Sequence, residues 1–261
     1  VKEKGGALLP YFVAVRNGDH NHLDQVARGN EKVLRARLSD ADFFYKEDQK
    51  LNIDKLVQKL DKIIYHEEIG SIGDKVRRIQ QITKHASELL EIDSQTQEKA
   101  SRAAEICKFD LVTNMVYEFP ELQGVMGERY ARLSGEDEAV AVAINEHYMP
   151  RHAEDSSPSS TIGALISLAD KLDTIVGCFS IGIIPTGSQD PYALRRMASG
   201  VVHILLDKGW NISLEELIDD VLQLFVEADI AKLEKLEIKK ELVQFFKLRI
   251  KYMLQEKTVR Y

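Results

Sequence analysis

Apolar residues recur every three or four positions through most of the chain, which is the pattern of amphipathic α-helices. The clearest case begins at Ile162 and continues to Val176, where the apolar side chains keep the spacing of a buried helix face. Prolines such as Pro150 and Pro185 end the segments that carry the pattern. The pattern predicts helices over residues 51–66, 74–92, 96–115, 121–133, 136–147, 162–184, 192–206, 213–228 and 233–257. We therefore expect a mainly α fold.

The N-terminal segment has a different pattern. Residues 7–16 alternate weakly between apolar and polar and lead into a turn signal, so they predict a strand and a turn. Residues 22–38 suit a helix, either continuous or interrupted at Gly29. The strand is expected to have an exposed edge, with its partner strands outside this sequence. We therefore expect residues 1–45 to be the end of an α/β unit, 46–208 a helical domain, and 209–261 the start of a following helical region.

Composition places the chain among soluble globular proteins. Its 261 residues are 44% hydrophobic, which is enough for a real core, and no apolar run reaches the ~20 residues of a membrane span. No signal peptide is visible, and the absence of a starting Met is expected of an excised fragment. Cys107 and Cys178 suit a reducing cytoplasm as small buried apolar residues without a disulfide. We expect a cytoplasmic protein with no membrane partner.

Charge limits the kind of nucleic acid that the chain can bind. The net charge of −7 argues against a protein that coats nucleic acid nonspecifically, and we expect no DNA partner. Residues 1–60 have a net charge of +2, whereas the rest of the chain has a net charge of −9. An RNA-binding surface would therefore be a local patch. One such patch is the segment with Lys32, Arg35 and Arg37, which is either a solvated helix face or a contact with phosphate or a partner subunit.

A corner joins the helices predicted over residues 162–184 and 192–206. Ser156 or Ser159 is expected to cap the first helix, and Asp190 followed by Pro191 is a cap signal for the second. Asp170 and Asp173 share one side of the first helix because they lie three residues apart.

Arg195 and Arg196 sit near the start of the second helix, where the helix dipole disfavours cations. One interpretation is that they bind carboxylates such as those of Asp170, Asp173 or Asp190 and lock the corner. The other is a phosphate clamp, in which the guanidinium groups act with free backbone N–H groups from Thr186 to Ser188.

Scattered His and Asp residues in a helical bundle raise the question of an HD-type metal-dependent phosphohydrolase. That class needs imidazole and carboxylate ligands from several helices, including an adjacent His-Asp pair. The chain has no His-Asp dipeptide; Asp110, His147 and Asp170 are the candidates for a degenerate site, with His66 and His85 as weaker ones. We expect an HD-like fold with no bound metal, in which Asp110 and Asp170 bind helix ends or nearby Arg.

Four segments of the sequence resemble the β subunit of the two-subunit bacterial glycyl-tRNA synthetase. They are GNEKVLRARLSDADFF (29–44), FDLVTNMVYEFPELQGVMG (109–127), ADKLDT (169–174) and PTGSQDPYALRR (185–196), in the family's order. The resemblance implies a helical bundle of HD-like type with a short N-terminal α/β remnant, and a central fragment without the family's C-terminal anticodon-binding region.

The resemblance also implies a function. The assembled enzyme, a heterotetramer, joins glycine to tRNA(Gly) with ATP and Mg, and the α subunit holds the adenylation site. This fragment is expected to contribute contacts to tRNA(Gly), to the α subunit or to both, with no cofactor and no catalytic residue of its own. Consistently, the sequence has no P-loop, no Rossmann glycine pattern, no G-x-S-x-G and no H-E-x-x-H.

Two alternatives stay open at this point. One is a stand-alone HD-type phosphohydrolase, which would bind metal and depend on Asp110 or Asp170. The other is a structural spacer that binds neither RNA nor metal, in which Arg195 and Arg196 matter only for stability.

Overall fold

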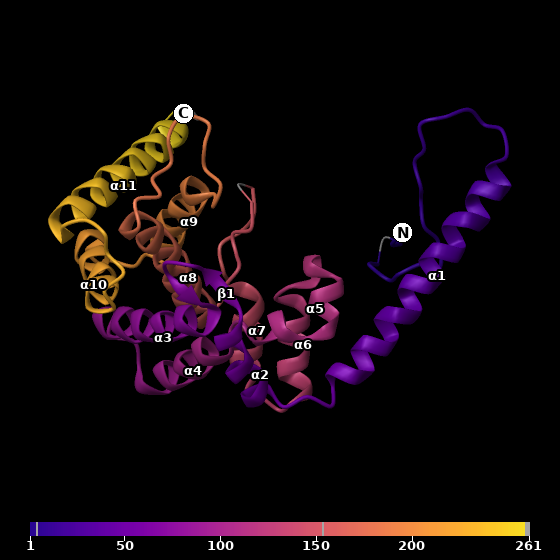
Figure 1. The fold of residues 1–261 in the computed structure, drawn as a ribbon, viewed down its shortest axis with the longest axis horizontal. Helices are drawn as coiled ribbons and strands as arrows, with labels where there is room; N and C mark the ends of the chain where they lie inside the picture. Colours follow the sequence, from indigo (N-terminus) through magenta and orange to yellow (C-terminus); the bar gives the residue numbers. More distant parts are fainter. Residues whose placement is uncertain (4, 153, 259–261) are drawn as a thin grey trace. The chain divides into compact units, whose positions relative to one another are not determined.

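A computed structural model describes residues 1–3, 5–152 and 154–258 of the chain (Figure 1). It divides into two compact units, Val1–Glu47 and Asp48–Tyr261. In the described part of the chain, no helix is long and apolar enough to cross a bilayer. The α-helical content agrees with the mainly α prediction, whereas the HD-like type of the bundle stays a prediction. So does the division of the helical part at residue 208.

The first unit contains all but the last residue of one long helix, α1 (Leu23–Asp48); Asp48 belongs to the second unit. The strand predicted over residues 7–16 is wrong: in the described residues of this unit, the β pairing is limited to an isolated bridge between Lys2 and Leu8. Weak alternation is not enough, because a strand needs a neighbour to satisfy its backbone N–H and C=O groups. The helix continues through Gly29, where a side chain would meet nothing within 4 Å. An exposed glycine costs a helix only about 1 kcal/mol.

The second unit begins with a short helix and a hairpin. Helix α2 (Ile53–Lys59) continues as the 3₁₀ turn η1 (Leu60–Lys62), and the chain then forms the antiparallel strands β1 (Ile64–His66) and β2 (Gly70–Ser71). The helix predicted over 51–66 therefore ends early. Gly70 has φ of +107°, which favours glycine. Ser71 and Asp74 then form a capping box that starts α3 (Ile72–Leu89).

The remaining elements follow the predicted order. They are α4 (Ser94–Ile106), η2 (Phe109–Val112), α5 (Asn114–Glu118), η3 (Pro120–Leu122), α6 (Val125–Leu133), α7 (Glu138–Glu146), α8 (Thr161–Ser180), α9 (Leu194–Asp207), α10 (Leu214–Glu227) and α11 (Lys235–Thr258). The helix predicted over 96–115 is in fact α4, η2 and α5, because Thr113 adopts an extended conformation and caps α5.

Helix α8 is the core of the second unit. It packs against α3, α4, α7, α9, α10 and α11, and all its residues except Thr161 and Asp170 are buried (Figure 1). A helix that is apolar on nearly every side is stable only when it is surrounded in this way. Its cap is Ser160, whose Oγ accepts the N–H of Gly163 at 2.9 Å, and neither Ser156 nor Ser159.

Candidate functional site

The two aspartates of α8 form the centre of a buried ionic cluster. Asp173 is fully buried; its Oδ1 lies 2.5 Å from Nε of Arg78, and its Oδ2 lies 2.8 Å from Nζ of Lys75. Lys75 also donates to Oγ1 of Thr174 at 2.8 Å. Both cations come from α3, so this cluster fastens α3 to α8.

Asp170 has two lysine partners from two different elements. Nζ of Lys108, at the junction of α4 and η2, lies 2.8 Å from its Oδ2. Nζ of Lys75 lies 3.0 Å from its Oδ1 as an ion pair, although the geometry is not that of an aligned hydrogen bond. Burial raises the pKa of Asp170, but Lys108 and Lys75 outweigh burial and hold this pKa well below its ordinary value. Asp170 is therefore a carboxylate with both oxygens engaged.

Sequence reasoning found the two aspartates but missed their cations. Lys75 and Arg78 lie three residues apart, and the apolar positions Ile79 and Ile82 continue the same spacing. Charged residues in register with a buried helix face were the signal that could have revealed them. Lys108 had no such signal, because it follows the end of α4.

Asp110 and His147, two of the three degenerate metal-site candidates, have protein partners. Oδ2 of Asp110 accepts the backbone N–H of Gly124 at 2.6 Å, just before α6, and Oδ1 has no hydrogen-bond partner among the described residues. Burial raises the pKa of Asp110 to about 6. Nδ1 of His147 lies 2.6 Å from the carbonyl oxygen of Ile144, and Nε2 is buried without a hydrogen-bond partner in the part of the chain that the structure describes. Burial and the nearby Lys108 hold the pKa of His147 well below its ordinary value.

These residues do not fit a metal centre. In residues 1–3, 5–152 and 154–258, no three His, Cys, Asp or Glu side chains lie close enough to hold a metal ion. The oxygens of Asp170 face ammonium groups, which repel a divalent cation. The weaker candidates are engaged elsewhere: Nδ1 of His66 accepts the N–H of Glu68 at 3.1 Å, and Nε2 of His85 lies 2.7 Å from Oδ2 of Asp220.

The corner between α8 and α9 contains a turn that is closed by two backbone hydrogen bonds. The backbone N–H of Thr186 donates to the carbonyl of Gln189 at 3.1 Å, and the reverse bond is 2.8 Å long. The expectation of a free N–H at Thr186 is therefore wrong. Asp190 is not the N-cap residue that was predicted, because α9 begins at Leu194 and follows Ala193; its carboxylate nevertheless accepts the N–H groups of Leu194 and Arg195 at 2.8 and 3.0 Å. The side chains of Thr186 and Ser188 are exposed.

The arginines of this corner do not lock it through ion pairs. Asp170 and Asp173 bind the cations described above, and Asp190 binds backbone N–H groups. In the described part of the chain, neither guanidinium group forms an ion pair or a hydrogen bond, so the locking interpretation is wrong for both side chains. Arg196 is exposed and Arg195 is half-buried. The phosphate-clamp interpretation stays a prediction.

The basic segment lies on α1 in the first unit. The side chains of Lys32, Arg35 and Arg37 are all exposed, and Asn30 is half-buried. Positions 32 and 35 lie on neighbouring turns of one face. Whether this face contacts phosphate, a partner or solvent stays a prediction.

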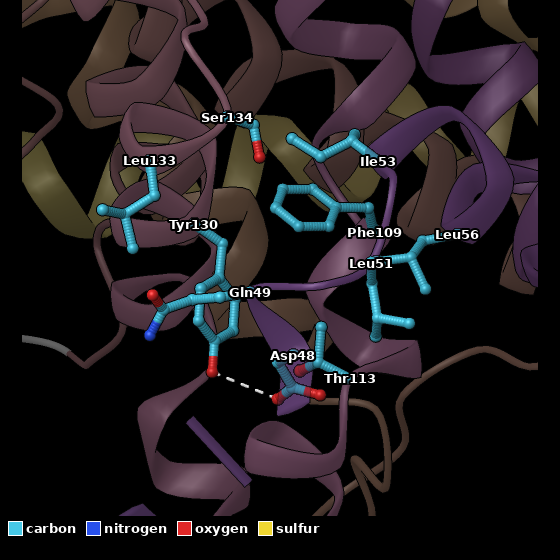
Figure 2. A pocket seen from close by; sticks show the side chains of 10 residues that line it. All are labelled: Asp48, Gln49, Leu51, Ile53, Leu56, Phe109, Thr113, Tyr130, Leu133 and Ser134. Atoms are coloured by element: carbon cyan, nitrogen blue, oxygen red, sulfur yellow. Dashed lines mark hydrogen bonds between the residues drawn. The ribbon is translucent and has the colours of Figure 1, made fainter. Parts of the chain in front are cut away.

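A small cavity lies between α2, η2 and α6, beside Asp48. Its volume is about 30 Å³, and Figure 2 shows Tyr130 and Leu133 on one side and Phe109 and Ile53 on the other. A cavity of this size holds a water molecule, whereas small-molecule pockets start near ~300 Å³. It is therefore no substrate site. Sequence reasoning missed Asp48, which lines it and is 4% exposed.

Comparison with known proteins covers the whole chain. The model of a family described as "Glycyl-tRNA synthetase beta subunit" matches residues 1–261. The chain is 59% identical over 261 residues to the glycine–tRNA ligase beta subunit of Bacillus subtilis (strain 168), with 100% of this chain and 36% of the relative covered. The corresponding subunit of Halalkalibacterium halodurans is 58% identical, with 100% and 38% covered. That of Listeria monocytogenes serovar 1/2a is 48% identical, again with 100% and 38% covered. The chain thus spans little more than a third of the length of these curated relatives.

Proposed function

Because this chain belongs to the glycyl-tRNA synthetase beta subunit family, we propose that it is part of an enzyme that joins glycine to tRNA(Gly) with ATP. The observation that carries the proposal is 59% identity along the full chain to a glycine–tRNA ligase beta subunit. The four sequence segments that resemble this family lie in both units, between Gly29 and Arg196.

The share of this chain in the reaction is to hold tRNA, the α subunit or both. The adenylation site then lies on the α subunit, which also accounts for ATP and Mg, so the assembled heterotetramer is the ligase. This part of the chain holds no cofactor and acts in the cytoplasm.

The alternative of a stand-alone HD-type phosphohydrolase has no observation in its favour. That reaction needs a carboxylate free to bind a metal ion, whereas Lys108 and Lys75 engage both oxygens of Asp170. The relatives named above are ligase subunits.

The corner between α8 and α9 is the part of the chain best suited to RNA phosphate. Arg195 and Arg196 have no carboxylate partner within the described chain, and an unpaired guanidinium fork matches the geometry of phosphate. The exposed hydroxyl groups of Thr186 and Ser188, in the turn that precedes α9, offer further hydrogen-bond donors. Lys32, Arg35 and Arg37 on α1 form a second candidate surface.

Fluorescence anisotropy tests this assignment. The chain is titrated into labelled tRNA(Gly) and a control tRNA at several salt concentrations, together with an Arg195→Ala/Arg196→Ala variant whose folding is checked by circular dichroism. If the two arginines contact phosphates, the variant binds more weakly, and the slope of log K against log salt falls by about 2.

A charge-matched variant separates contact from net charge. Lys59→Ala/Lys62→Ala removes two exposed cations from α2 and η1 and should bind like the wild type. Equal weakening in both variants would mean that only net charge matters. Unchanged binding in the folded arginine variant would move the search to α1 and to the α-subunit interface.

A further inference from the structure

Arg249 packs over two aromatic rings of its own helix, α11. Its guanidinium carbon lies 5.2 Å from the centre of the Phe245 ring and 5.6 Å from the centre of the Tyr252 ring. Aromatic faces attract a guanidinium group through stacking and through the cation–π interaction, and two such contacts limit the rotamers that the side chain adopts. The positive charge at position 249 is therefore held in place before any ligand binds.

The guanidinium group of Arg249 is not used within the described chain. In the residues that the structure describes, Arg249 forms no ion pair and no hydrogen bond, and its Nε is buried without an acceptor. Because only Nε of its three nitrogen atoms is buried, Nη1 and Nη2 reach solvent. The side chain thus presents an unpaired fork of N–H donors, which is the geometry that binds a phosphate through two parallel hydrogen bonds.

The surrounding half of α11 is basic. Residues 242–255 carry three cations and no acidic residue, although the whole chain has a net charge of −7. The cations are Arg249, Lys247 and Lys251, and both lysines are exposed without an ion pair or hydrogen bond in the described part of the chain. Tyr252 is 53% exposed, which leaves part of its ring open to stack with an unpaired base. Cations beside an exposed aromatic ring favour RNA over an acidic protein as the partner.

This part of α11 packs against the two helices that form the corner. The ring centre of Phe245 lies 5.1 Å from that of Phe179 in the last turn of α8, and Arg249 follows Phe245 by about one helical turn. Helix α11 also packs on α9, whose first turn carries Arg195 and Arg196. Helix α11 thus adds a third unpaired guanidinium group to those two.

We propose that Arg249, held by Phe245 and Tyr252, binds a backbone phosphate of RNA as part of the surface that holds tRNA. This inference rests on the proposed function, because it assigns a further contact to the same RNA. The rings hold the guanidinium group in advance, so little rotamer entropy is lost when a phosphate binds. The phosphate supplies the acceptors that the described chain does not offer to Nη1 and Nη2.

Three variants separate the guanidinium fork from its charge. Arg249→Met keeps an unbranched side chain over the rings but removes the charge and the N–H donors. Arg249→Lys keeps the charge but has no planar fork. Lys84→Met removes an exposed cation from α3 and is the control for net charge.

Fluorescence anisotropy of the whole chain with labelled tRNA(Gly) measures binding, and circular dichroism checks that each variant is folded. We expect Arg249→Met to weaken binding about tenfold and to lower the slope of log K against log salt by about 1. Arg249→Lys should keep the slope but bind more weakly than the wild type, because a point charge cannot replace two parallel hydrogen bonds. Lys84→Met should stay within about twofold of the wild type.

Chemical protection gives a second measurement that needs no substitution. Phenylglyoxal modifies accessible guanidinium groups, and mass spectrometry of peptides identifies the modified arginine. Bound tRNA(Gly) should slow the modification of Arg249 in the wild-type chain. It should not slow that of Arg77, which is exposed on α3 and paired with carboxylates.

Three results would overturn the inference and leave the proposed function standing. The first is equal weakening by Arg249→Met and Lys84→Met, or no weakening by a folded Arg249→Met. The second is an Arg249→Lys variant that binds as tightly as the wild type. The third is a tRNA complex in which Arg249 is modified as fast as in the free chain, which would assign this face to a protein partner. A wild-type chain that binds no tRNA would instead contradict the proposed tRNA contact itself, and the inference with it.

Discussion

The hydroxyl group of Tyr130 on α6 donates a hydrogen bond of 3.1 Å to Oδ2 of Asp48, the last residue of α1 (Figure 2). The same carboxylate accepts the backbone N–H groups of Asn114 and Met115, each at 2.9 Å. Asp48 thereby satisfies the first N–H groups of α5, which a five-residue helix cannot satisfy itself. One buried side chain thus fixes the start of α5 and ties it to Tyr130 in α6.

Replacing Asp48 should therefore be costly. Asp48→Ala leaves buried N–H groups without acceptors and should lower the free energy of unfolding by about 3 kcal/mol, whereas Tyr130→Phe should lower it by about 1 kcal/mol. Urea denaturation measures both. Glu88→Ala, at an exposed position of α3, should stay within about 0.5 kcal/mol of the wild type. Equal losses for Asp48→Ala and Glu88→Ala would refute the role of Asp48.

Asp173 should matter far more than an exposed aspartate with an arginine partner. Asp173→Asn leaves the buried cations Lys75 and Arg78 undercompensated and should cost about 3–5 kcal/mol. Asp61→Asn breaks a 2.8 Å pair with Arg77 in which both side chains are about half exposed, and should cost less than about 1 kcal/mol. Chemical denaturation in urea compares them. A similar cost for the two would mean that the ionic cluster does not hold α3 on α8.

Asp110 should make stability depend on pH. Burial raises its pKa from 3.8 to about 6, so between these values the folded chain holds a proton that the unfolded chain has lost. The stabilisation is thus complete below about pH 4 and is lost as pH rises through 6, to a total of about 3 kcal/mol.

The neutral isostere isolates this effect. Asp110→Asn keeps an oxygen for the N–H of Gly124 but has no proton to lose. Urea denaturation of both proteins between pH 4.5 and 7.5 should show the wild type losing stability relative to the variant as pH rises. Parallel curves would show that Asp110 has an ordinary pKa in the folded chain.

Both cysteines should resist thiol reagents in the folded chain. Cys107 and Cys178 are buried and free, as the sequence predicted, and burial raises their pKa values to about 12 and about 11. Thiolate is the reactive form, so almost none is present at pH 7. A chromogenic disulfide reagent should label two thiols per chain in denaturant and none without it over minutes. Rapid labelling of the native chain would show that one thiol is accessible.

The helices were predictable where the apolar pattern had one explanation. Helix α8 combines a serine cap with an apolar sequence; the choice of serine was wrong, and the helix ends at Ser180, before the predicted end at residue 184. Residues 60–66 keep the apolar spacing of α2, yet the chain turns into a hairpin because Gly70 and the Ser71 cap start a new helix. Residues 7–16 show the opposite failure: their sequence alternates, but among the described residues no strand pairs with them.

The ionic cluster was only half predictable, because a charge is buried only when its partner is present. Asp170 and Asp173 were placed on one face from their spacing alone. Their partners are far away in sequence: Lys75 lies 98 residues before Asp173, and Lys108 lies 62 residues before Asp170. The local spacing of residues along the sequence cannot predict ion pairs between residues so far apart. It also led to the interpretation that Arg195 and Arg196 bind those carboxylates.

The sequence separation of 98 residues between Lys75 and Asp173 also has a consequence during synthesis. At about 5–20 residues per second, a ribosome needs roughly 5–20 s to make the intervening chain. Over that time α3 is complete but has no α8 to cover its apolar face or neutralise its cations. The nascent chain therefore exposes the apolar face and the positive charges of α3 until Asp173 has been synthesised. During this interval chaperones can bind that apolar face.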